Sequence, residues 1–455
     1  MLIIAQKMTQ IHFFFFLIFL CFLRQSLSSP SPSPSPLNST FSFPNEALPT
    51  KSGYLPINPK SKSAIFYTFY EAQNTSLPIS QTPLIFWLQG GPGCSSMIGN
   101  FLELGPFRVV DSLILERNFG SWNRIFGLVF LDNPIGVGFS FAADQAEIPK
   151  DQHSVAEHLF GAITEFLNSN TEFKTRPVYI TGESYAGKYV PSIGYYILEK
   201  NTKLQRSKRV NLKGVAIGNG LTDPVTQVKT HADSAYYSGL INQRQKTELK
   251  EAQSKVIEFV KLRNWSEATN ARNNVLNLLQ NMTGLATLYD YTRKVPYKTS
   301  LVTKLLQSVE VKKALGANVS MIFDECSKIV GEKLHEDVMK SVKFKVDFLV
   351  MKIKVLLYQG LFDLRDGVVS TEAWVRTMKW GEIKSFLMAE REIWKVNGEV
   401  AGYVQKWGNL SNVVVLGTGH LVPTDQGLHS QAMIEDWVLD KGNFAWRKYS
   451  ESASE

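Results

Sequence analysis

Cysteine is scarce in this 455-residue chain, which contains only three. Cys21 lies in an N-terminal apolar segment, so Cys94 and Cys326 are the one pair left to the rest of the chain. One pair allows at most one intramolecular disulfide, and in an oxidising compartment we expect it to close a very long loop. Two free, buried thiols are the alternative.

The chain also lacks an apolar run long enough to span a membrane. Its most apolar run, at 11–23, is shorter than the roughly 20 residues that a spanning helix needs. Lys7 precedes it and small polar residues follow at 26–29, which is typical of a signal peptide, here 1–28. We therefore expect a protein of the secretory pathway, extracellular or vacuolar/lysosomal, with no stable membrane anchor after cleavage. An uncleaved anchor is the alternative.

A concentrated basic patch is missing as well. The net charge is +8, but the positive residues are scattered, and the densest cluster, at 203–209, is short and flanked by polar residues. A solvated loop explains this cluster better than a nucleic-acid contact, so we expect no nucleic-acid partner. Hydrophobic residues make up 44% of the chain, which is enough for a large core.

The segment after the signal peptide repeats Ser-Pro at 29–36 and has no capacity for a core, so we interpret 29–42 as a linker and expect order to begin near Phe43. Asn-x-Ser/Thr triplets mark candidate glycosylation sites of an exported protein. They are Asn38, Asn74, Asn264, Asn281, Asn318 and Asn409.

Short apolar runs alternate with amphipathic stretches along the rest of the chain. Most runs are continuously apolar and bounded by glycine or proline, as expected for strands buried on both faces. They lie at 64–70, 84–88, 128–131, 178–181, 215–217, 355–358 and 413–416, with helical periodicity at 155–167, 189–198 and 428–439. The alternation predicts an α/β fold, with a mostly parallel central sheet flanked by helices.

This alternation stops between 223 and 323. The stretch is polar, has helical patterns at 243–262 and 271–279, and contains no strand-like run. We interpret 223–323 as a helical insertion that forms a lid over an active site, with a purely decorative insertion as the alternative. The core then has a first part at 43–222 and a second at 324–447, followed by a polar tail at 448–455.

A serine lies in a sharp turn between a predicted strand and a predicted helix. Residues 179–187 read YITGESYAG, so Ser184 has the small residues Gly182 and Ala186 two positions away on either side. A nucleophile elbow requires small residues at these places. We therefore predict that Ser184 is a nucleophile presented at the carboxyl edge of the sheet.

Such a serine needs a histidine base and an acid that orients the histidine. The chain has only seven histidines, and His420 follows a predicted strand within the loop GTGHLVP. Helical or polar contexts surround His153, His158, His231, His335 and His429. Asp363 falls just past the predicted strand at 355–358, in the order serine, acid, histidine that this fold type uses. We predict a triad of Ser184, Asp363 and His420, with Asp366 as the rival acid.

A glycine-rich loop, QGGPGCSS at 89–96, follows the predicted strand at 84–88. Hydrolases of this kind take one oxyanion-hole amide from such a loop and the other from the residue after the nucleophile, here Tyr185. A phosphate-binding loop is excluded, because no Gly-Lys-Ser/Thr follows.

Together these motifs resemble the serine carboxypeptidases and their plant serine carboxypeptidase-like relatives. The resemblance implies an α/β-hydrolase fold with a helical insertion, the same triad, an oxyanion hole formed by Gly91 and Tyr185, and a disulfide between Cys94 and Cys326. It implies neither a metal nor an organic cofactor. The matching blocks are WLQGGPGCSS (87–96), FLELGP (101–106), FLDNPIGVGFS (130–140), GESYAG (182–187), IGNGLTDP (217–224) and GTGHLVPTDQ (417–426).

The resemblance also implies how a peptide end is bound. Glu103 and Glu183 match a pair of acids that bind the terminal carboxylate, and Gln89 and Gly90 belong to the same site. Because two adjacent carboxyl groups do not both ionise easily, one should stay protonated and donate a hydrogen bond to the substrate. We expect the release of C-terminal residues from peptides or proteins at acidic pH.

Three positions depart from the family pattern. Most members have Asn at Gln89, Pro at Gly427 and, in many cases, Cys at Asp366. Some plant relatives transfer acyl groups from sugar esters, so an acyltransferase is one alternative function, and a non-catalytic binding protein with a hydrolase fold is another. The preferred terminal residue cannot be read from the sequence, and a homodimer is left open.

Overall fold

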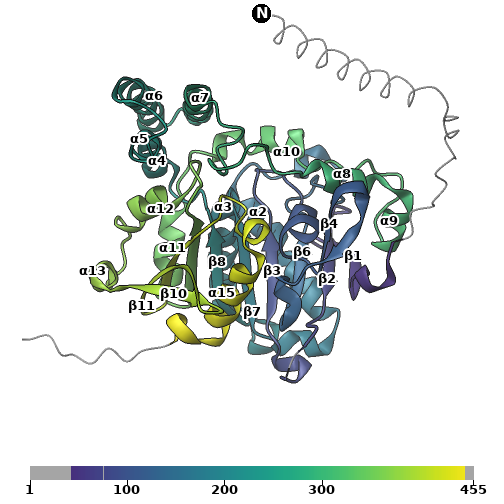
Figure 1. The fold of residues 1–455 in the computed structure, drawn as a ribbon. Helices are drawn as coiled ribbons and strands as arrows, with labels where there is room; N and C mark the ends of the chain where they lie inside the picture. The colour runs from purple at the N-terminus through teal and green to yellow at the C-terminus, as the bar shows by residue number, and fades with distance from the viewer. Residues whose placement is uncertain (1–42, 75, 446–455) are drawn as a thin grey trace, which may run out of the picture. The chain divides into compact units, whose positions relative to one another are not determined.

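A ten-stranded mixed sheet runs through the middle of the protein (Figure 1). The computed structural model describes residues 43–74 and 76–445. The predicted signal peptide, linker, polar tail and Asn38 lie outside these residues. In spatial order the strands are β1 (Lys51–Pro56), β2 (Ala64–Tyr70), β6 (Gly127–Leu131), β3 (Leu84–Leu88), β7 (Val178–Glu183), β8 (Leu212–Gly218), β9 (Lys354–Gly360), β12 (Leu410–Val415), β11 (Glu399–Trp407) and β10 (Arg391–Val396).

The six strands from β6 to β12 are parallel, which confirms the predicted sheet type. Their apolar runs are buried on both faces, and β7 shows how. Ile180 belongs to the main core together with Leu159 and Ile193 from helices on one face. Tyr179 points to the other face, where its ring lies 5.4 Å from that of Trp437. Alternate residues thus reach opposite layers of helices.

The antiparallel edge strands β1 and β10, and β11 next to β10, are missing from the predicted set. They are only partly buried, so polar residues interrupt their apolar pattern. The sequence did contain one signal for them, because Asn397 and Gly398 join β10 to β11 with φ values of 52° and 87°. Asn-Gly is a favoured pair for such a hairpin turn. A separate two-stranded sheet consists of β4 (Phe107–Val109) and β5 (Leu115–Arg117).

Helices cover both faces of the sheet (Figure 1). One layer contains α2, α3 and α11, which pack against the sheet in the main core, and α15 lies on the opposite face with Trp437. The helix bounds are α2 (Gln152–Asn168), α3 (Ala186–Lys203), α4 (Pro224–Gln227), α5 (His231–Tyr237), α6 (Gln243–Lys261), α7 (Trp265–Thr283), α8 (Ser300–Gln307), α9 (Val309–Ala314), α10 (Lys328–Lys333), α11 (Lys343–Val350), α12 (Val368–Val375), α13 (Ile383–Met388), α14 (Val422–Asp425) and α15 (Gly427–Leu439).

The chain between β8 and β9 contains helices α4 to α11 and no strand. Helices α6 and α7 pack side by side at one end of the sheet (Figure 1). Asn242 caps α6 with a capping box, and Gly284, with a φ of 67°, ends α7. The limits 223–323 and the lid role of this segment remain predictions.

Four candidate glycosylation sites, Asn74, Asn264, Asn281 and Asn318, are exposed. Asn409 is half-buried, and its Nδ2, the atom that would carry a glycan, donates a hydrogen bond of 2.9 Å to Val350 O. Asn409 is therefore the least suitable acceptor of the five described. None of the helices in the described residues is long and apolar enough to cross a membrane.

Candidate active site

Ser184 lies in a left-handed turn between β7 and α3. Its φ is 60°, which is strained for a residue with a side chain. Backbone hydrogen bonds hold the turn: Ser184 N donates to Gly218 O at 3.0 Å, and Leu221 N donates to Ser184 O at 2.9 Å. A Cβ atom on Gly182 would lie 2.4 Å from Leu88 O, so the turn requires glycine there.

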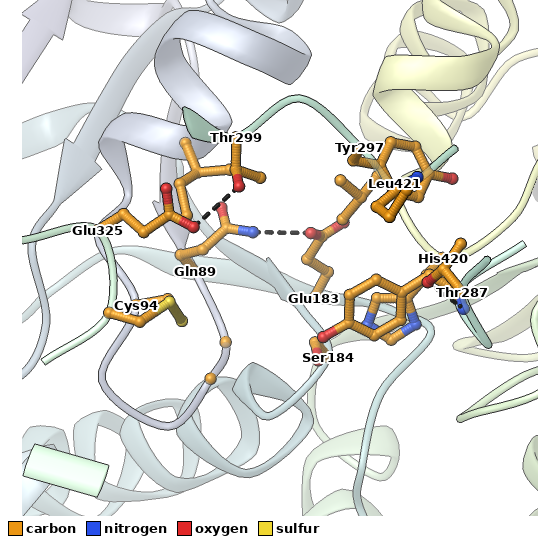
Figure 2. A pocket seen from close by; sticks show the side chains of 16 residues that line it. Gln89, Cys94, Glu183, Ser184, Thr287, Tyr297, Thr299, Glu325, His420 and Leu421 are labelled. Carbon is orange, nitrogen blue, oxygen red and sulfur yellow. Dashed lines mark hydrogen bonds between the residues drawn. A yellow bond between two sulfur atoms is a disulfide. The ribbon is translucent and has the colours of Figure 1, made fainter. Parts of the chain in front are cut away.

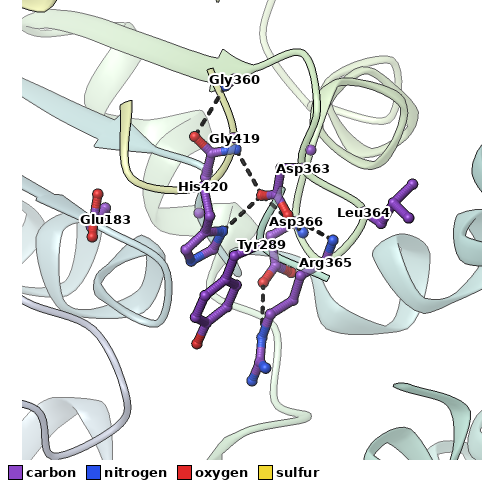
Figure 3. A network of polar contacts seen from close by, with 12 residues as sticks. Glu183, Tyr289, Gly360, Asp363, Leu364, Arg365, Asp366, Gly419 and His420 are labelled. Atoms are coloured by element: carbon purple, nitrogen blue, oxygen red, sulfur yellow. Dashed lines mark hydrogen bonds and ion pairs between the residues drawn. The ribbon is translucent and has the colours of Figure 1, made fainter. Parts of the chain in front are cut away.

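His420 and Asp363 form a buried pair beside this turn (Figure 3). His420 Nδ1 lies 2.7 Å from Asp363 Oδ2. His420 Nε2 has no hydrogen-bond partner among the described residues, and His420 lines the same pocket as Ser184. The rival acid, Asp366, instead directs its carboxylate to Arg272, at 3.5 Å. The structure therefore brings Ser184, Asp363 and His420 together.

Two residues outside the predicted set fix the position of this pair. Asn219 follows β8; its Nδ2 donates to Asp363 Oδ2 at 2.7 Å, and its Oδ1 accepts from Gly360 N at 3.2 Å. The Tyr289 ring stacks on the His420 imidazole with centroids 4.4 Å apart and an interplanar angle of 10°. Asn219 belongs to the block IGNGLTDP and could have been found there. Tyr289 lies in the helical insertion and has no motif around it.

The loop at 89–96 passes directly beside the turn. A Cβ atom on Gly90 would lie 2.7 Å from both Ser184 Cβ and Tyr185 N, so only glycine allows this approach. Neither Gly91 N nor Tyr185 N donates a hydrogen bond to another described residue. Both amides are therefore available to a negatively charged oxygen that forms near Ser184.

Asp132, just past β6, anchors this loop and was not among the predicted residues. Its Oδ1 accepts hydrogen bonds from Ser95 Oγ at 2.5 Å and Ser96 N at 2.9 Å, and its Oδ2 accepts one from Phe139 N at 2.9 Å. Burial raises the pKa of Asp132 to about 6, against the opposing effect of these hydrogen bonds. The signal for it in the sequence was an acidic residue inside the block FLDNPIGVGFS.

A disulfide joins Cys94 to Cys326, 232 residues apart, which confirms the predicted bridge. Ser95 N also donates a hydrogen bond of 2.8 Å to Glu325 O. These two links tie the loop at 89–96 to the segment that follows α9.

Two carboxyl groups, Glu103 and Glu183, lie next to the serine and are fully buried. Gln89 connects them, because its Nε2 donates to Glu183 Oε1 at 2.7 Å (Figure 2). The same Nε2 donates to Glu103 Oε1 at 3.2 Å. Trp87 Nε1 in turn donates to Gln89 Oε1 at 2.9 Å and fixes the orientation of the amide. Both acids are therefore buried groups rather than solvated loop residues.

Burial is the main reason why both acids hold their protons tightly. It raises the pKa of Glu103 to about 7, although Gln89 acts in the opposite direction. Burial, followed by the neighbouring charge of Glu103, raises the pKa of Glu183 well above its ordinary value. At least one of the two carboxyl groups is therefore protonated in weakly acidic solution and can donate a hydrogen bond.

A pocket of about 250 Å³ joins these groups (Figure 2). Ser184, His420, Gln89 and Glu183 line its inner end. The outer wall is formed by the disulfide, Glu325 and residues of the chain between α7 and α8: Thr287, Tyr289, Pro296, Tyr297 and Thr299. A small molecule or chain end that enters the pocket therefore meets Ser184 together with Glu183 and Gln89, and Gln89 links Glu183 to Glu103.

Comparisons with known proteins agree with this geometry. The family model described as serine carboxypeptidase matches residues 40–440. The chain belongs to the serine carboxypeptidase family. It is 58% identical to serine carboxypeptidase-like 50 of Arabidopsis thaliana, over 90% of this chain and 92% of that one.

More distant relatives of this serine carboxypeptidase support the same assignment. It is 33% identical to the probable serine carboxypeptidase CPVL of Homo sapiens, over 90% of this chain and 86% of that one. Its fold is similar to that of Kex1(Δ)p, a prohormone-processing carboxypeptidase from Saccharomyces cerevisiae, with a TM-score of 0.79 and 28% identity over 89% of this chain and 95% of that one. The predicted α/β-hydrolase fold is thereby confirmed.

The departures from the family pattern have local explanations in this serine carboxypeptidase. Gln89 reaches both carboxyl groups and Trp87 at once, so its longer side chain fits the surrounding contacts. Gly427 begins α15 where space is limited, because a Cβ atom on it would lie 3.1 Å from Arg108 Nη2 and 3.5 Å from Gly120 Cα. Asp366 pairs with Arg272.

Proposed function

We propose that this serine carboxypeptidase releases single residues from the C-termini of peptides or proteins. Ser184 is the nucleophile, His420 the general base and Asp363 the residue that orients the imidazole. The hydrogen bond between Asp363 and His420 Nδ1 leaves Nε2 free to take the proton of Ser184. Asn219 and Tyr289 hold the acid and the imidazole in place.

The reaction proceeds in two steps. Ser184 Oγ attacks the carbonyl carbon of the last peptide bond while His420 accepts its proton, and the amides of Gly91 and Tyr185 stabilise the oxyanion. His420 then protonates the leaving nitrogen, and the terminal amino acid departs. A water molecule, deprotonated by His420, hydrolyses the acyl-enzyme and returns the proton to Ser184. These steps require only side chains, backbone amides and water.

The observation that carries the proposal is the buried carboxyl pair beside the serine. A terminal carboxylate placed against protonated Glu103 or Glu183 receives a charge-assisted hydrogen bond, whereas an internal peptide segment offers no such group. Together with Gln89 and the backbone at Gly90, the pair therefore selects chain ends. As the pH rises and the pair ionises, the pair binds the terminal carboxylate more weakly. The enzyme is therefore suited to acidic compartments.

We further propose that the enzyme works in the secretory pathway, outside the cell or in a vacuole or lysosome. The disulfide between Cys94 and Cys326 supports an oxidising compartment during folding. The raised pKa of Glu103, about 7, supports work in an acidic one. Helices at 223–323 act as the lid, which agrees with the contribution of Tyr289 and Tyr297 to the pocket wall.

The test measures amino-acid release from N-blocked dipeptides, with Ser184→Ala as the matched control. We expect release at acidic pH by the wild-type enzyme and a loss of at least about a thousandfold in the variant. A glucose ester offered with an alcohol acceptor tests the acyltransferase alternative. Faster acyl transfer from the ester than release from any dipeptide would contradict the proposal.

A further inference from the structure

A second cavity, of about 170 Å³, also meets Ser184. It shares Gly91 and Ser184 with the pocket that Gln89 and Glu183 line, but its other lining residues are different. A peptide whose terminal carboxylate lies at the carboxyl pair must cross Ser184 at its last peptide bond. The second cavity is then a space next to Ser184 that is available to the side chain before that bond.

Arg272, on α7, lines this second cavity and lacks a close partner. Its side chain is 4% exposed, and it makes one ion pair, to Asp366 at 3.5 Å. None of its guanidinium nitrogens donates a hydrogen bond to another described residue, although the group carries five N–H donors. A buried cation with unused donors that faces a cavity next to a nucleophile is suited to an anionic ligand.

Other charges around the second cavity leave it positive. Arg365 also lines it, with Nε 3.9 Å from Asp366 Oδ2 and the guanidinium over the Tyr289 ring. Asp366 is the one acid in the lining, and it is shared between both arginines and Gln227 Nε2, at 3.4 Å. Figure 3 shows Arg365 directed toward Asp366 beside the His420–Asp363 pair.

The remaining titratable groups nearby are already engaged. Asp363 is bound to His420 and Asn219. His335 lines the cavity, and its two ring nitrogens face Ser266 Oγ at 3.5 Å and Asn270 Oδ1 at 3.0 Å. Among the lining residues two arginines thus face one carboxylate, Asp366, and the charge of Asp363 lies outside the lining.

We propose that the second cavity binds an acidic side chain, aspartate or glutamate, at the penultimate position of the substrate, with Arg272 as the specificity-determining residue. The inference rests on the proposed function, because it concerns the acyl side of the same cleaved bond. The carboxylate of the substrate supplies the close acceptor that Arg272 lacks, and Arg365 adds a second cation.

The experiment compares N-blocked dipeptides that share one terminal residue and carry Glu, Gln or Lys before it. At about pH 5.5 the Glu side chain is ionised. We expect kcat/KM for the Glu peptide to exceed that for its isosteric Gln partner by about tenfold or more, and the Lys peptide to be slowest. In Arg272→Gln the ratio of Glu to Gln should fall close to one.

Two further variants test whether the effect depends on the charges that line the second cavity. Asp366→Asn removes the competing carboxylate, so the ratio should rise rather than fall. Arg244→Gln removes a surface arginine with a 79% exposed side chain and should leave the ratio unchanged. If Arg272→Gln does not fold, Arg365→Gln, at a 29% exposed side chain, should lower the ratio instead.

The outcomes separate the two claims. Equal kcat/KM for the Glu and Gln peptides, or an unchanged ratio in Arg272→Gln or Arg365→Gln, overturns the penultimate preference and leaves the proposed function intact. Release from none of the three peptides by the folded wild-type enzyme overturns the proposed function and this inference with it.

Discussion

Gln89 Nε2 donates a hydrogen bond of 2.7 Å to Glu183 Oε1. The same amide also reaches Glu103, and Trp87 holds its oxygen, so the length of the side chain is matched to three partners. Gln89→Asn shortens it by one methylene and should break at least one of these contacts. We expect KM for a blocked dipeptide to rise about tenfold, the loss of roughly one hydrogen bond to a charged group, with a smaller change in kcat.

The carboxyl pair predicts an acidic pH profile for peptides. The pKa of Glu103 is raised to about 7 and that of Glu183 lies well above its ordinary value, so the protonated forms persist in acid and are lost as pH rises. Ionisation then places negative charge against the terminal carboxylate of the substrate. We expect KM for a blocked dipeptide to rise as the pH passes about 7.

An N-blocked amino-acid ester serves as the control for this profile, because its leaving group has no carboxylate. Its kcat/KM should persist to higher pH than that of the dipeptide. In Glu183→Gln the dipeptide profile should become flatter. Identical pH profiles for the ester and the dipeptide would contradict the role of the pair.

The same groups predict how stability depends on pH. An acid whose pKa is raised by folding binds more protons in the native state than in the unfolded state, so the free energy of unfolding decreases with rising pH. For Glu103 this loss of stability falls between its pKa of 4.5 in the unfolded state and its pKa of about 7 in the folded state. Urea denaturation at several pH values across this interval should show the decrease, and Glu103→Gln should reduce it. A wild-type stability that rises throughout the interval in step with the variant's would contradict this linkage.

Asp363 and Asn219 should differ in their effect on catalysis. Asp363→Asn leaves the shape of the residue but removes the charge that orients His420, and we expect kcat to fall by roughly 10³–10⁴. Asn219→Ala removes one hydrogen bond to Asp363, so a loss of about tenfold is expected. Steady-state kinetics of the two variants, after thermal melts confirm folding, check this order, and the reverse order would contradict it.

Gly90 should tolerate no side chain. Gly90→Ala places a Cβ atom 2.7 Å from Ser184 Cβ and Tyr185 N, so the loop must move away and carry the Gly91 amide with it. We expect kcat to fall by about 10², the order of magnitude for losing one oxyanion donor. Gly381→Ala is the matched control, because a Cβ atom there meets nothing within 4 Å. Equal activity of the two variants would contradict the placement of the loop.

The sequence predicts the central strands well because burial on both faces leaves a continuous apolar run. The predicted limits 64–70 and 84–88 coincide with β2 and β3. The strands β10 and β11 were not predicted. In β10 only Trp394 is buried, and its hairpin partner β11 begins with exposed residues. Their pairing is decided by contacts between strands rather than by the local pattern.

For the site, sequence motifs indicate the groups that meet at strand ends, such as Ser184 and Asp363. They do not indicate side chains that reach the site from elsewhere. Tyr289 stacks on His420 from the chain between α7 and α8, and Arg272 reaches the second cavity from α7. Such contacts depend on tertiary packing between segments far apart in the chain.

The central claim is that the enzyme selects chain ends through a free carboxylate. The most direct measurement is kcat/KM at about pH 5 for an N-blocked dipeptide and for the same dipeptide with its C-terminus amidated, with Ser184→Ala as background. The account predicts that the free acid is cleaved about a hundredfold faster or more, as expected for the loss of a buried charge-assisted contact. Equal cleavage of the acid and the amide would contradict it.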